Sequence, residues 1–370
     1  MVFFLVQCLK LIKMKINNFS AGPSKIPNEV INTIKGSIEN FNNLGYSILE
    51  ISHRSSEFLD IVNNSKILFS QLLNIPSNYE IVFLQGGATF QNSFLPLNFP
   101  NLNKDIIFLL TGTWGKKTYD DFNLLFANNL NNITYNNHTL KQLTEEISLT
   151  KQDKMFLTSN ETIDGIQLRN FNSFNKQLYI DMSSDICSYK FSWENVEYVF
   201  AGAQKNLGIP GLTIIIFDPN KLNVQNIPSY LNLQNHLDKN SLFNTPPTFS
   251  IYVLYEMLNW MKNLGGLEYI ENLNRVKSES VYAFLDSHED IIQVPVNDEF
   301  RSLSNIIFNF KNKDYDKAFL EFAKENGFIG LNGHRSVGGI RVSNYNSITK
   351  NMTDELLSLL NDFILKNDNK

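Results

Sequence analysis

The sequence contains very little cysteine and no excess of positive charge. Each absence argues against particular kinds of site or binding partner. Only two of its 370 residues are cysteine, Cys8 and Cys187, and neither belongs to a CxxC or a Cys/His pattern. A disulfide framework and a structural metal site are therefore not expected. The formal net charge is −5, so we expect no binding to nucleic acid. Any anion site must be built locally from a few arginines, lysines and histidines.

Apolar runs of membrane length are also missing. The first residues, MVFFLVQCLKLIKMK, are too short and too interrupted by lysine to span a bilayer, and no small-residue cleavage site follows them. We expect residues 1–14 to be a disordered or mis-called extension rather than a targeting segment, with Met14 as the true start. The sequence thus predicts a cytoplasmic protein without membrane contact.

Short apolar runs alternate with helical patterns over much of the chain. Such nearly continuous runs are typical of strands covered on both faces of a mostly parallel sheet. The length suggests two domains. We expect a three-layer α/β large domain over residues 28–265 and a smaller α+β domain formed by residues 15–27 and 266–370. The expected strands of the large domain are 80–84, 106–110, 154–159, 177–181, 197–203 and 212–217. Those of the smaller domain are 304–310 and 337–343.

The stretch EYVFAGAQKNLGIPGLT, residues 197–213, is the most informative part of the sequence. An apolar strand there ends in a small-residue turn that presents Lys205. Because burying a lone ammonium is costly, the pKa of a lysine at the mouth of a sheet can fall, and its neutral amine attacks aldehydes. A Schiff-base lysine for pyridoxal phosphate needs this arrangement. An ordinary surface lysine after a strand fits the stretch equally well when it is taken alone.

The position of Asp181 favours the interpretation of Lys205 as a Schiff-base lysine. Asp181 ends the predicted strand QLYID, 24 positions before Lys205. A carboxylate at a buried strand end needs a partner, and a protonated pyridine nitrogen would be one. The two side chains lie at the ends of successive predicted strands, so both could reach one ring from different sides.

Other predicted strand ends carry residues with two readings each. The turn Gln85-Gly86-Gly87-Ala88-Thr89 could bind a phosphate through N–H groups at a helix start, or it could be an ordinary turn. Trp114 offers a flat face to an aromatic ring, although a core tryptophan is the plainer reading. The hydroxyl of Thr162 could donate to a phenolic oxygen or cap a helix.

Two His-Arg pairs stand out in this acidic chain. ILEISHRSSEF contains His53 and Arg54, and LNGHRSVGGIRVS contains His334, Arg335 and a further arginine, Arg341. The guanidinium fork matches the geometry of carboxylates and phosphates. These residues therefore indicate a doubly anionic substrate, with scattered solvated charge as the alternative.

Motifs from about Phe19 onward resemble those of the phosphoserine aminotransferases, class V aminotransferases of fold type I. They occur in order as FSAGPS, EISHR, QGG, TGTW, SNETIDGI, DMSSD, AGAQKNLG-PGLT, NTPPTF and GHRSVGGIRVS. The resemblance implies amino transfer from L-glutamate to 3-phosphohydroxypyruvate, giving O-phospho-L-serine and 2-oxoglutarate in serine synthesis. It also suggests a side activity on a phosphorylated hydroxythreonine precursor of pyridoxine.

The resemblance further implies individual roles. Lys205 would bind pyridoxal phosphate and shuttle the substrate proton, and Asp181 would keep the pyridine nitrogen protonated. The other cofactor contacts would be Ala88, Thr89, Trp114, Thr162, Gln204, Asn244 and Thr245, the last two from the other subunit of a homodimer. The substrate contacts would be His334, Arg335 and Arg341, together with His53 and Arg54 from the partner. Many members have arginine where Thr89 stands, so phosphate binding here would depend more on backbone N–H groups.

Two other functions stay open at this point. Another class V enzyme, such as a different aminotransferase, a lyase or a desulfurase, would keep the fold and the cofactor. A desulfurase needs a reactive thiol, Cys187 is a poor candidate, and no cysteine follows it in the chain. An inactive dimeric scaffold is the third reading, and the retention of Lys205, Asp181 and both basic clusters counts against it.

Overall fold

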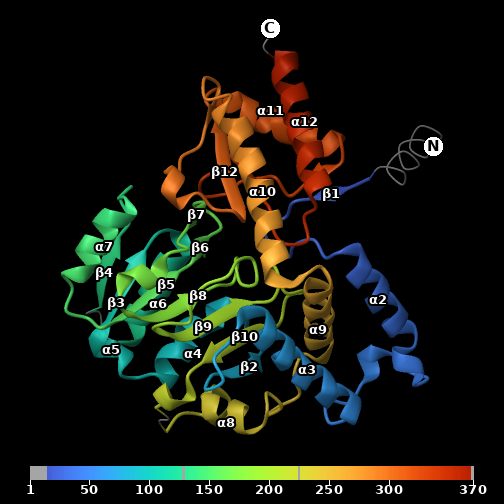
Figure 1. Cartoon of the computed structure of the whole chain (residues 1–370), viewed down its shortest axis with the longest axis vertical. Coiled ribbons are helices and arrows are strands. Elements are labelled where there is room, and N and C mark those ends of the chain that lie inside the picture. Colours follow the sequence, from blue (N-terminus) through green and yellow to red (C-terminus); the bar gives the residue numbers. More distant parts are fainter. Residues whose placement is uncertain (1–14, 127–129, 224–225, 368–370) are drawn as a thin grey trace.

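The structure is a computed structural model, and it describes residues 15–126, 130–223 and 226–367. The expectations for residues 1–14, and the residue Cys8, lie outside this range. The molecule is elongated, with a large lobe around the main sheet and a small lobe above it in Figure 1. No helix in the described residues is both long and apolar enough to cross a membrane.

The large lobe is built on a seven-stranded sheet with the order β2-β10-β9-β8-β5-β3-β4. Only β10 runs antiparallel to its neighbours; the other pairs are parallel. This mostly parallel sheet confirms the predicted fold class. The strands are β2 (Glu80–Leu84), β3 (Ile106–Leu110), β4 (Asn131–Thr134), β5 (Lys154–Thr158), β8 (Gln177–Asp181), β9 (Val196–Gly202) and β10 (Thr213–Phe217).

One strand of this sheet was not predicted. The edge strand β4 has the sequence NNIT and buries only Ile133. A strand at an edge, exposed along most of its length, needs no apolar run, so its sequence carries no strand signal.

Two hydrophobic cores cover the two faces of the sheet. Successive side chains of a strand point to opposite faces, so Ile81 and Phe83 enter one core while Val82 and Leu84 enter the other. The first face is covered by α2 (Asn28–Glu39), α3 (Ser56–Leu73), α7 (Leu140–Ser148) and α9 (Thr248–Asn263). The second is covered by α4 (Gly87–Asn98), α5 (Leu102–Asp105), α6 (Thr113–Leu125) and α8 (Leu233–Asp238).

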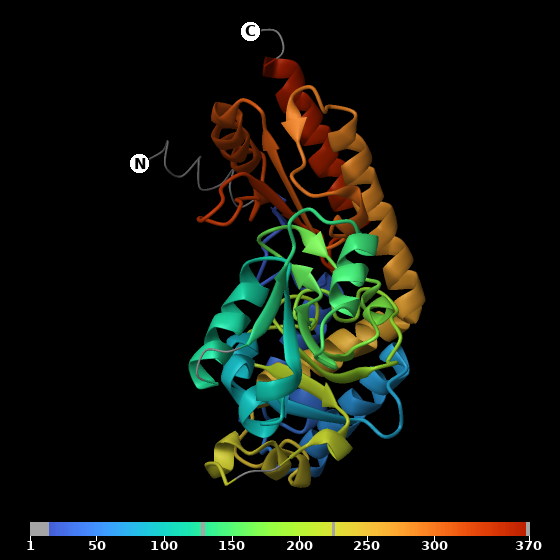
Figure 2. The ribbon, with the colours of Figure 1, turned by 90° about the vertical axis from the view of Figure 1, so that its left-hand side faces the viewer.

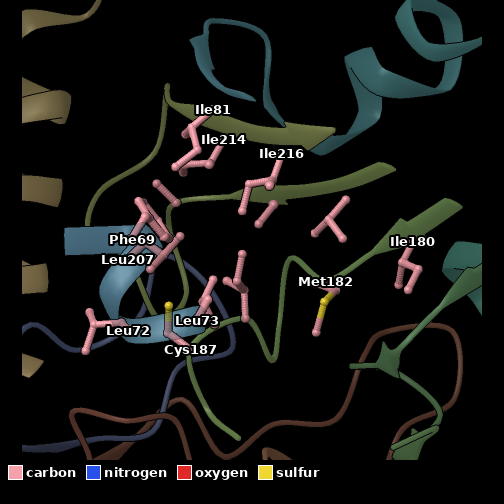
Figure 3. Packing of buried hydrophobic residues seen from close by; sticks show 14 of the residues in the cluster. Phe69, Leu72, Leu73, Ile81, Ile180, Met182, Cys187, Leu207, Ile214 and Ile216 are labelled. Atoms are coloured by element: carbon pink, nitrogen blue, oxygen red, sulfur yellow. The ribbon is translucent and has the colours of Figure 1, made fainter. Parts of the chain in front are cut away.

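Helix α3 shows how the first core is built. Its buried residues recur at helical spacing, and Figure 3 shows Phe69, Leu72 and Leu73 close to Leu207 and Cys187. Leu207 lies in the loop that follows β9, two residues after Lys205, and belongs to this core. The segment that carries Lys205 is therefore supported from below by packed apolar side chains.

The small lobe has its own core. Strand β12 (Asn305–Phe310) lies between β11 (Ile292–Gln293) and β14 (Ile340–Ser343), antiparallel to both. Helices α11 (Lys313–Glu325) and α12 (Lys350–Asn367) pack against this sheet. The N-terminal strand β1 (Asn17–Asn18) pairs in parallel with β13 (Phe328–Ile329), so the start of the described chain runs along this lobe.

Helix α10 (Gly266–Asp286) joins the two lobes, as Figure 2 shows. Its first turns bury Leu267 and Ile270 in the large lobe, and its last turns bury Val281 and Leu285 in the small lobe. The pair Gly265-Gly266 separates it from α9. Both glycines have positive φ, +114° and +74°, which side chains rarely adopt.

The prediction of a strand over 337–343 is wrong in its first half. The strand β14 begins only at Ile340. Gly338 and Gly339 have positive φ, and the N–H of Gly333 donates to the carbonyl of Gly339 at 2.9 Å. The residues before Ile340 therefore form a folded loop rather than extended backbone.

Candidate active site

A cavity of about 380 Å³ lies where the strand ends of the large lobe meet the small lobe. Ligands in sheets of this kind bind at such strand ends. The N-terminal segment closes one side of the cavity with Ala21 and Gly22. The sequence-predicted residues that line it are Ala88, Thr89, Trp114, Thr162, Asp181, Gln204, Lys205, His334 and Arg341.

Asp181 and Lys205 lie together in this cavity. Asp181 ends β8, and Lys205 follows the parallel neighbour β9 by three residues. Burial raises the pKa of Asp181, against the Lys205 ammonium and the hydrogen bonds from Ser183, which lower it. Burial lowers the pKa of Lys205, against Asp181, which raises it. An amine with a lowered pKa is closer to its nucleophilic, neutral form.

An anion site opens at the start of α4. Gly86 and Gly87 follow β2 with positive φ, and a Cβ at Gly86 would lie 2.8 Å from the Cβ of Phe90. Glycine is therefore required in this turn. No side chain caps the helix, so the N–H groups of its first turn, including those of Ala88 and Thr89, face the cavity without a capping partner. Such N–H groups favour a phosphate.

Trp114 lies in the first turn of α6 and contacts Thr162. The indole Nε1–H of Trp114 donates to the hydroxyl of Thr162 at 2.9 Å. Both residues line the cavity, so Trp114 is not a core tryptophan. Thr162 caps no helix, and its own hydroxyl proton is left to donate to another acceptor.

Two carboxyl groups that the sequence analysis missed bind the start of α6. Glu161 is fully buried and accepts hydrogen bonds from the N–H of Trp114 at 2.9 Å and of Gly115 at 2.7 Å. Asp164 accepts from the N–H of Thr113 at 2.9 Å. Burial raises the pKa of Glu161 to about 8, although these N–H groups lower it. The signal was present as two acidic residues flanking Thr162 in SNETIDGI.

Arg341 reaches the cavity from the small lobe. Its Nη1 donates to the carbonyl of Thr162 at 3.1 Å, while its Nε is buried without a hydrogen-bond partner. Burial also lowers the pKa of Arg341. A half-buried guanidinium with an unused donor is suited to bind an anionic ligand.

The loop before β14 carries the other predicted basic residues of the small lobe. His334 lines the cavity, and its Nδ1 lies 2.6 Å from the hydroxyl of Ser336. Arg335 is exposed and lies outside the cavity lining. The exposed Lys117 of α6 lies at the cavity as well, a cation that the sequence analysis did not select.

Besides Arg335, four predicted residues do not line the cavity of their own chain: His53, Arg54, Asn244 and Thr245. Arg54 is exposed, and His53 is half-buried. The carbonyl of Thr245 accepts from the side chain of Gln85 at 3.0 Å, just before the turn that opens α4. The structure thus brings nine of the predicted site residues together and leaves these four and Arg335 outside the cavity lining.

Comparisons with known proteins agree with this geometry. Residues 16–356 match the family model described as aminotransferase class-V. The chain belongs to the class V aminotransferases. It is 39% identical over 351 residues to a phosphoserine aminotransferase of Halalkalibacterium halodurans, covering 94% of this chain and 97% of the relative. A phosphoserine aminotransferase of Bacillus cereus is 39% identical over 358 residues, with 95% and 99% covered.

Solved structures of class V aminotransferases share the fold. A phosphoserine aminotransferase from Bacillus circulans subsp. alkalophilus superposes with a TM-score of 0.87 at 33% identity, covering 94% of this chain and 98% of that one. The pyridoxal phosphate-bound enzyme from Trichomonas vaginalis has a TM-score of 0.87 at 31% identity, covering 94% and 100%.

The cavity of this class V aminotransferase fits pyridoxal phosphate. Lys205 offers an amine to the aldehyde, and Asp181 offers a buried carboxylate to a protonated pyridine nitrogen. The uncapped start of α4 offers N–H groups to the phosphate. A Cβ at Gly22 would lie 3.6 Å from the Cγ of Lys205, an ordinary van der Waals distance, so the N-terminal segment packs directly against the lysine.

Proposed function

We propose that this chain transfers the amino group of L-glutamate to 3-phosphohydroxypyruvate, giving O-phospho-L-serine and 2-oxoglutarate for serine synthesis, with pyridoxal phosphate as cofactor. The observation that carries the proposal is the shared cavity of Lys205, Asp181 and Arg341, which combines an amine, a buried acid and an unpaired guanidinium donor. Similarity to phosphoserine aminotransferases over nearly the full length supports the choice of substrates.

Pyridoxal phosphate, when bound, supplies an electron sink for the carbanion that forms at the substrate Cα. Lys205 would hold the cofactor and would move the proton to and from that carbon. Asp181 would hold the pyridine N–H through its carboxylate. Thr162 orients the indole of Trp114 towards the ring position and has a proton left for the phenolic oxygen. The N–H groups of Ala88 and Thr89, with Gln204, would hold the phosphate.

Arg341 would bind the α-carboxylate that both substrates share. Its bond to the carbonyl of Thr162 orients the guanidinium, and its free Nε remains for the ligand. His334 and Arg335 would bind the distal phosphate or γ-carboxylate. Flexible basic side chains suit this task because one site must accept the two groups in turn.

We also propose a homodimer with shared active sites. His53, Arg54, Asn244 and Thr245 do not line the cavity of their own chain, and their expected roles require the cavity of a second subunit. In that assembly Asn244 and Thr245 would reach the cofactor phosphate, and His53 and Arg54 the distal substrate group. Cross-complementation tests this: mixing inactive Lys205→Ala and inactive Arg54→Ala chains would restore part of the activity.

Three further predictions accompany this function. We propose a large domain over residues 28–265 and a small domain of 15–27 and 266–370, which the separate hydrophobic core of the small lobe supports. A cytoplasmic location and the side activity in pyridoxine synthesis remain predictions from the sequence and from the resemblance.

A two-step spectral titration tests the function. Adding L-glutamate to the purified holoenzyme is expected to bleach the visible absorbance of the cofactor, and adding 3-phosphohydroxypyruvate is expected to restore it. A chain bleached by another amino donor and not by glutamate would be a different class V aminotransferase. No change with any donor would indicate an inactive scaffold.

Desulfurase activity has little support in the structure. Cys187 is buried in the core of the large lobe, and burial raises the pKa of its thiol. A thiol that neither ionises nor meets solvent is a poor sulfur acceptor. Release of sulfide from cysteine by the holoenzyme would contradict this conclusion.

A further inference from the structure

A lysine side chain is buried in the middle of α10 and forms no ion pair within the described residues. Lys277 has no exposed surface, and it lies between Ile270, which packs in the large lobe, and Val281, which packs in the small lobe. Burial lowers the pKa of Lys277 to about 7, and no charged neighbour in the described part of the chain offsets this. The active-site chemistry described above makes no use of this group.

Three backbone carbonyl groups surround its nitrogen. The Nζ of Lys277 lies 2.8 Å from the oxygen of Ile348, 2.9 Å from that of Tyr345 and 3.4 Å from that of Asn344. We call these three oxygens the carbonyl cage. An ammonium has three N–H donors and no acceptor, whereas a neutral amine has only two donors and a lone pair. The cage therefore matches the ammonium form, with each N–H directed at one carbonyl.

All three carbonyls belong to one turn, residues 344–348, which also contacts the loop that carries Lys205. The backbone N–H of Asn346 donates to the side-chain oxygen of Asn206 at 3.1 Å, and its side-chain amide donates to the carbonyl of Cys187 at 2.8 Å. Asn206 directly follows Lys205 and is itself buried. The position of the turn and the position of the lysine loop are thus linked by buried hydrogen bonds.

The same turn is continuous with the substrate-binding strand. It follows β14 directly, and Arg341 lies in that strand. The hydroxyl of Tyr345 donates to the carbonyl of Ala21 at 2.9 Å, and Ala21 lines the cavity. The turn 344–348 is therefore connected to Arg341, to the loop of Lys205 and to Ala21. Three of its carbonyls accept hydrogen bonds from Lys277.

We propose that Lys277 is a positioning residue of the active site, whose ammonium fixes the turn 344–348 as a rigid link between Arg341 and the loop of Lys205. Lys277 does not line the cavity, so it acts only through this turn. Without the ammonium, the carbonyls of Asn344 and Ile348 would lose their donor, and that of Tyr345 would keep only the backbone N–H of Ile348 at 3.0 Å. A buried acceptor without a donor is costly. The turn would then relax, and Arg341 would move relative to the cofactor site.

Lys277→Met tests the proposal because methionine keeps most of the volume and removes the charge. The matched control is Arg275→Met in the same helix, where the cation is exposed and pairs with Glu279 at 3.0 Å. The holoenzymes are compared by KM and kcat for L-glutamate, and by the pH midpoint of the cofactor absorbance. We expect KM for glutamate to rise about tenfold and the midpoint to shift in Lys277→Met, with both unchanged in the control.

An unchanged KM together with an unchanged absorbance midpoint would overturn the proposal, even if the melting temperature falls, because a purely structural lysine would lower stability alone. Should Lys277→Met fail to fold, Asn346→Ala replaces it. This variant keeps the buried ammonium and removes the amide bonds to Cys187 and Asn274, at 2.8 Å each. The same rise in KM and the same shift are expected, and their absence would likewise overturn the proposal.

Chemical rescue gives an independent readout. Lys277→Ala removes three carbons and the nitrogen, the atoms of n-propylammonium. We expect n-propylammonium to lower the KM of this variant towards the wild-type value and propan-1-ol to have no effect. Equal effects of the two compounds would show that only volume matters.

The glutamate measurement rests on the proposed function, whereas the absorbance measurement needs only bound cofactor. A wild-type chain that does not turn over glutamate would refute the proposed function. The role of Lys277 would then still be decided by the absorbance midpoint.

Discussion

The indole N–H of Trp114 donates to the hydroxyl of Thr162 at 2.9 Å, which fixes an aromatic plane at the wall of the active-site cavity. The same short segment, residues 160–164, supplies the two carboxyl groups that bind the first turn of α6. The orientation of Trp114 is therefore determined twice, through its side chain by Thr162 and through its backbone by Glu161. The following predictions test this arrangement and the cofactor and substrate contacts around it.

Replacing Thr162 by valine removes the acceptor of the indole N–H and the hydroxyl expected at the phenolic oxygen. We expect the cofactor to bind about tenfold more weakly, as for the loss of a hydrogen bond in a largely buried site. Titration of the apoenzyme with pyridoxal phosphate, followed by absorbance and tryptophan fluorescence, measures this. Thr162→Ser keeps the hydroxyl and should bind almost as well as the wild type. Equal weakening in both variants would count against the assigned role.

Glu161 should make stability depend on pH. Its pKa is about 8 in the folded chain, raised from 4.5 by burial. The folded state thus holds a proton that the unfolded state releases between these two pH values. The stabilisation is fully present below about pH 4.5 and is lost as the pH rises through 8.

Comparison with Glu161→Gln isolates this effect, because the amide does not titrate. From pH 5 to pH 9 the melting temperature of the wild type should fall relative to that of the variant, by an amount that corresponds to a few kcal/mol. Parallel pH profiles of the two proteins would show that Glu161 does not titrate in this range.

Asp181→Asn should leave the cofactor bound and reduce kcat strongly. An amide cannot stabilise a protonated pyridine nitrogen, so the ring loses most of its capacity to accept electrons. We expect a loss on the order of 100-fold or more. Stopped-flow measurement of the half-reaction with glutamate separates this from weaker binding. Activity within a factor of a few of the wild type would refute the pairing of Asp181 with the ring nitrogen.

Arg335→Ala should discriminate between substrates. The side chain is exposed in the loop before β14 and is expected to contact the distal anionic group only. The KM for the phosphorylated keto acid should rise more than that for a keto acid without a distal charge, such as pyruvate. Arg341→Ala is the matched comparison, and it should weaken both substrates because both carry an α-carboxylate. Equal losses for the two substrates in Arg335→Ala would indicate a structural role.

Most strands of the large lobe were predictable because their apolar sequences match their burial on both faces of the sheet. A run such as IIFLL is apolar on both faces because both faces of the sheet are covered, so β3 was found with its exact bounds. The polar strand β4 and the folded loop before Ile340 were missed or misread. Their conformation depends on a neighbouring strand and on glycine φ angles rather than on an apolar period.

Some residues in and around the site were likewise indicated by the sequence pattern, and others were not. Lys205 and Asp181 were selected because a charged side chain is conspicuous at the end of an apolar strand. Asp181 is the last residue of β8, and Lys205 follows β9 by three residues. Glu161 was overlooked, since an acidic residue in a polar loop is ordinary until the loop is seen to fold against the start of α6. Lys277 gave no signal either, because a lysine in an amphipathic helix is usually exposed.

The sequence by itself determined which residues are proposed to carry the chemistry, since side-chain type and position at a strand end are local properties. It also determined the sheet and the helices that cover it, because hydrophobic period follows from burial. Only the tertiary structure decided what each of these side chains contacts: that Trp114 meets Thr162, that Arg341 keeps a free donor, and that one turn links Lys277 to the lysine loop. Such contacts join residues far apart in the chain, and they depend on how the two lobes pack, which no local pattern records.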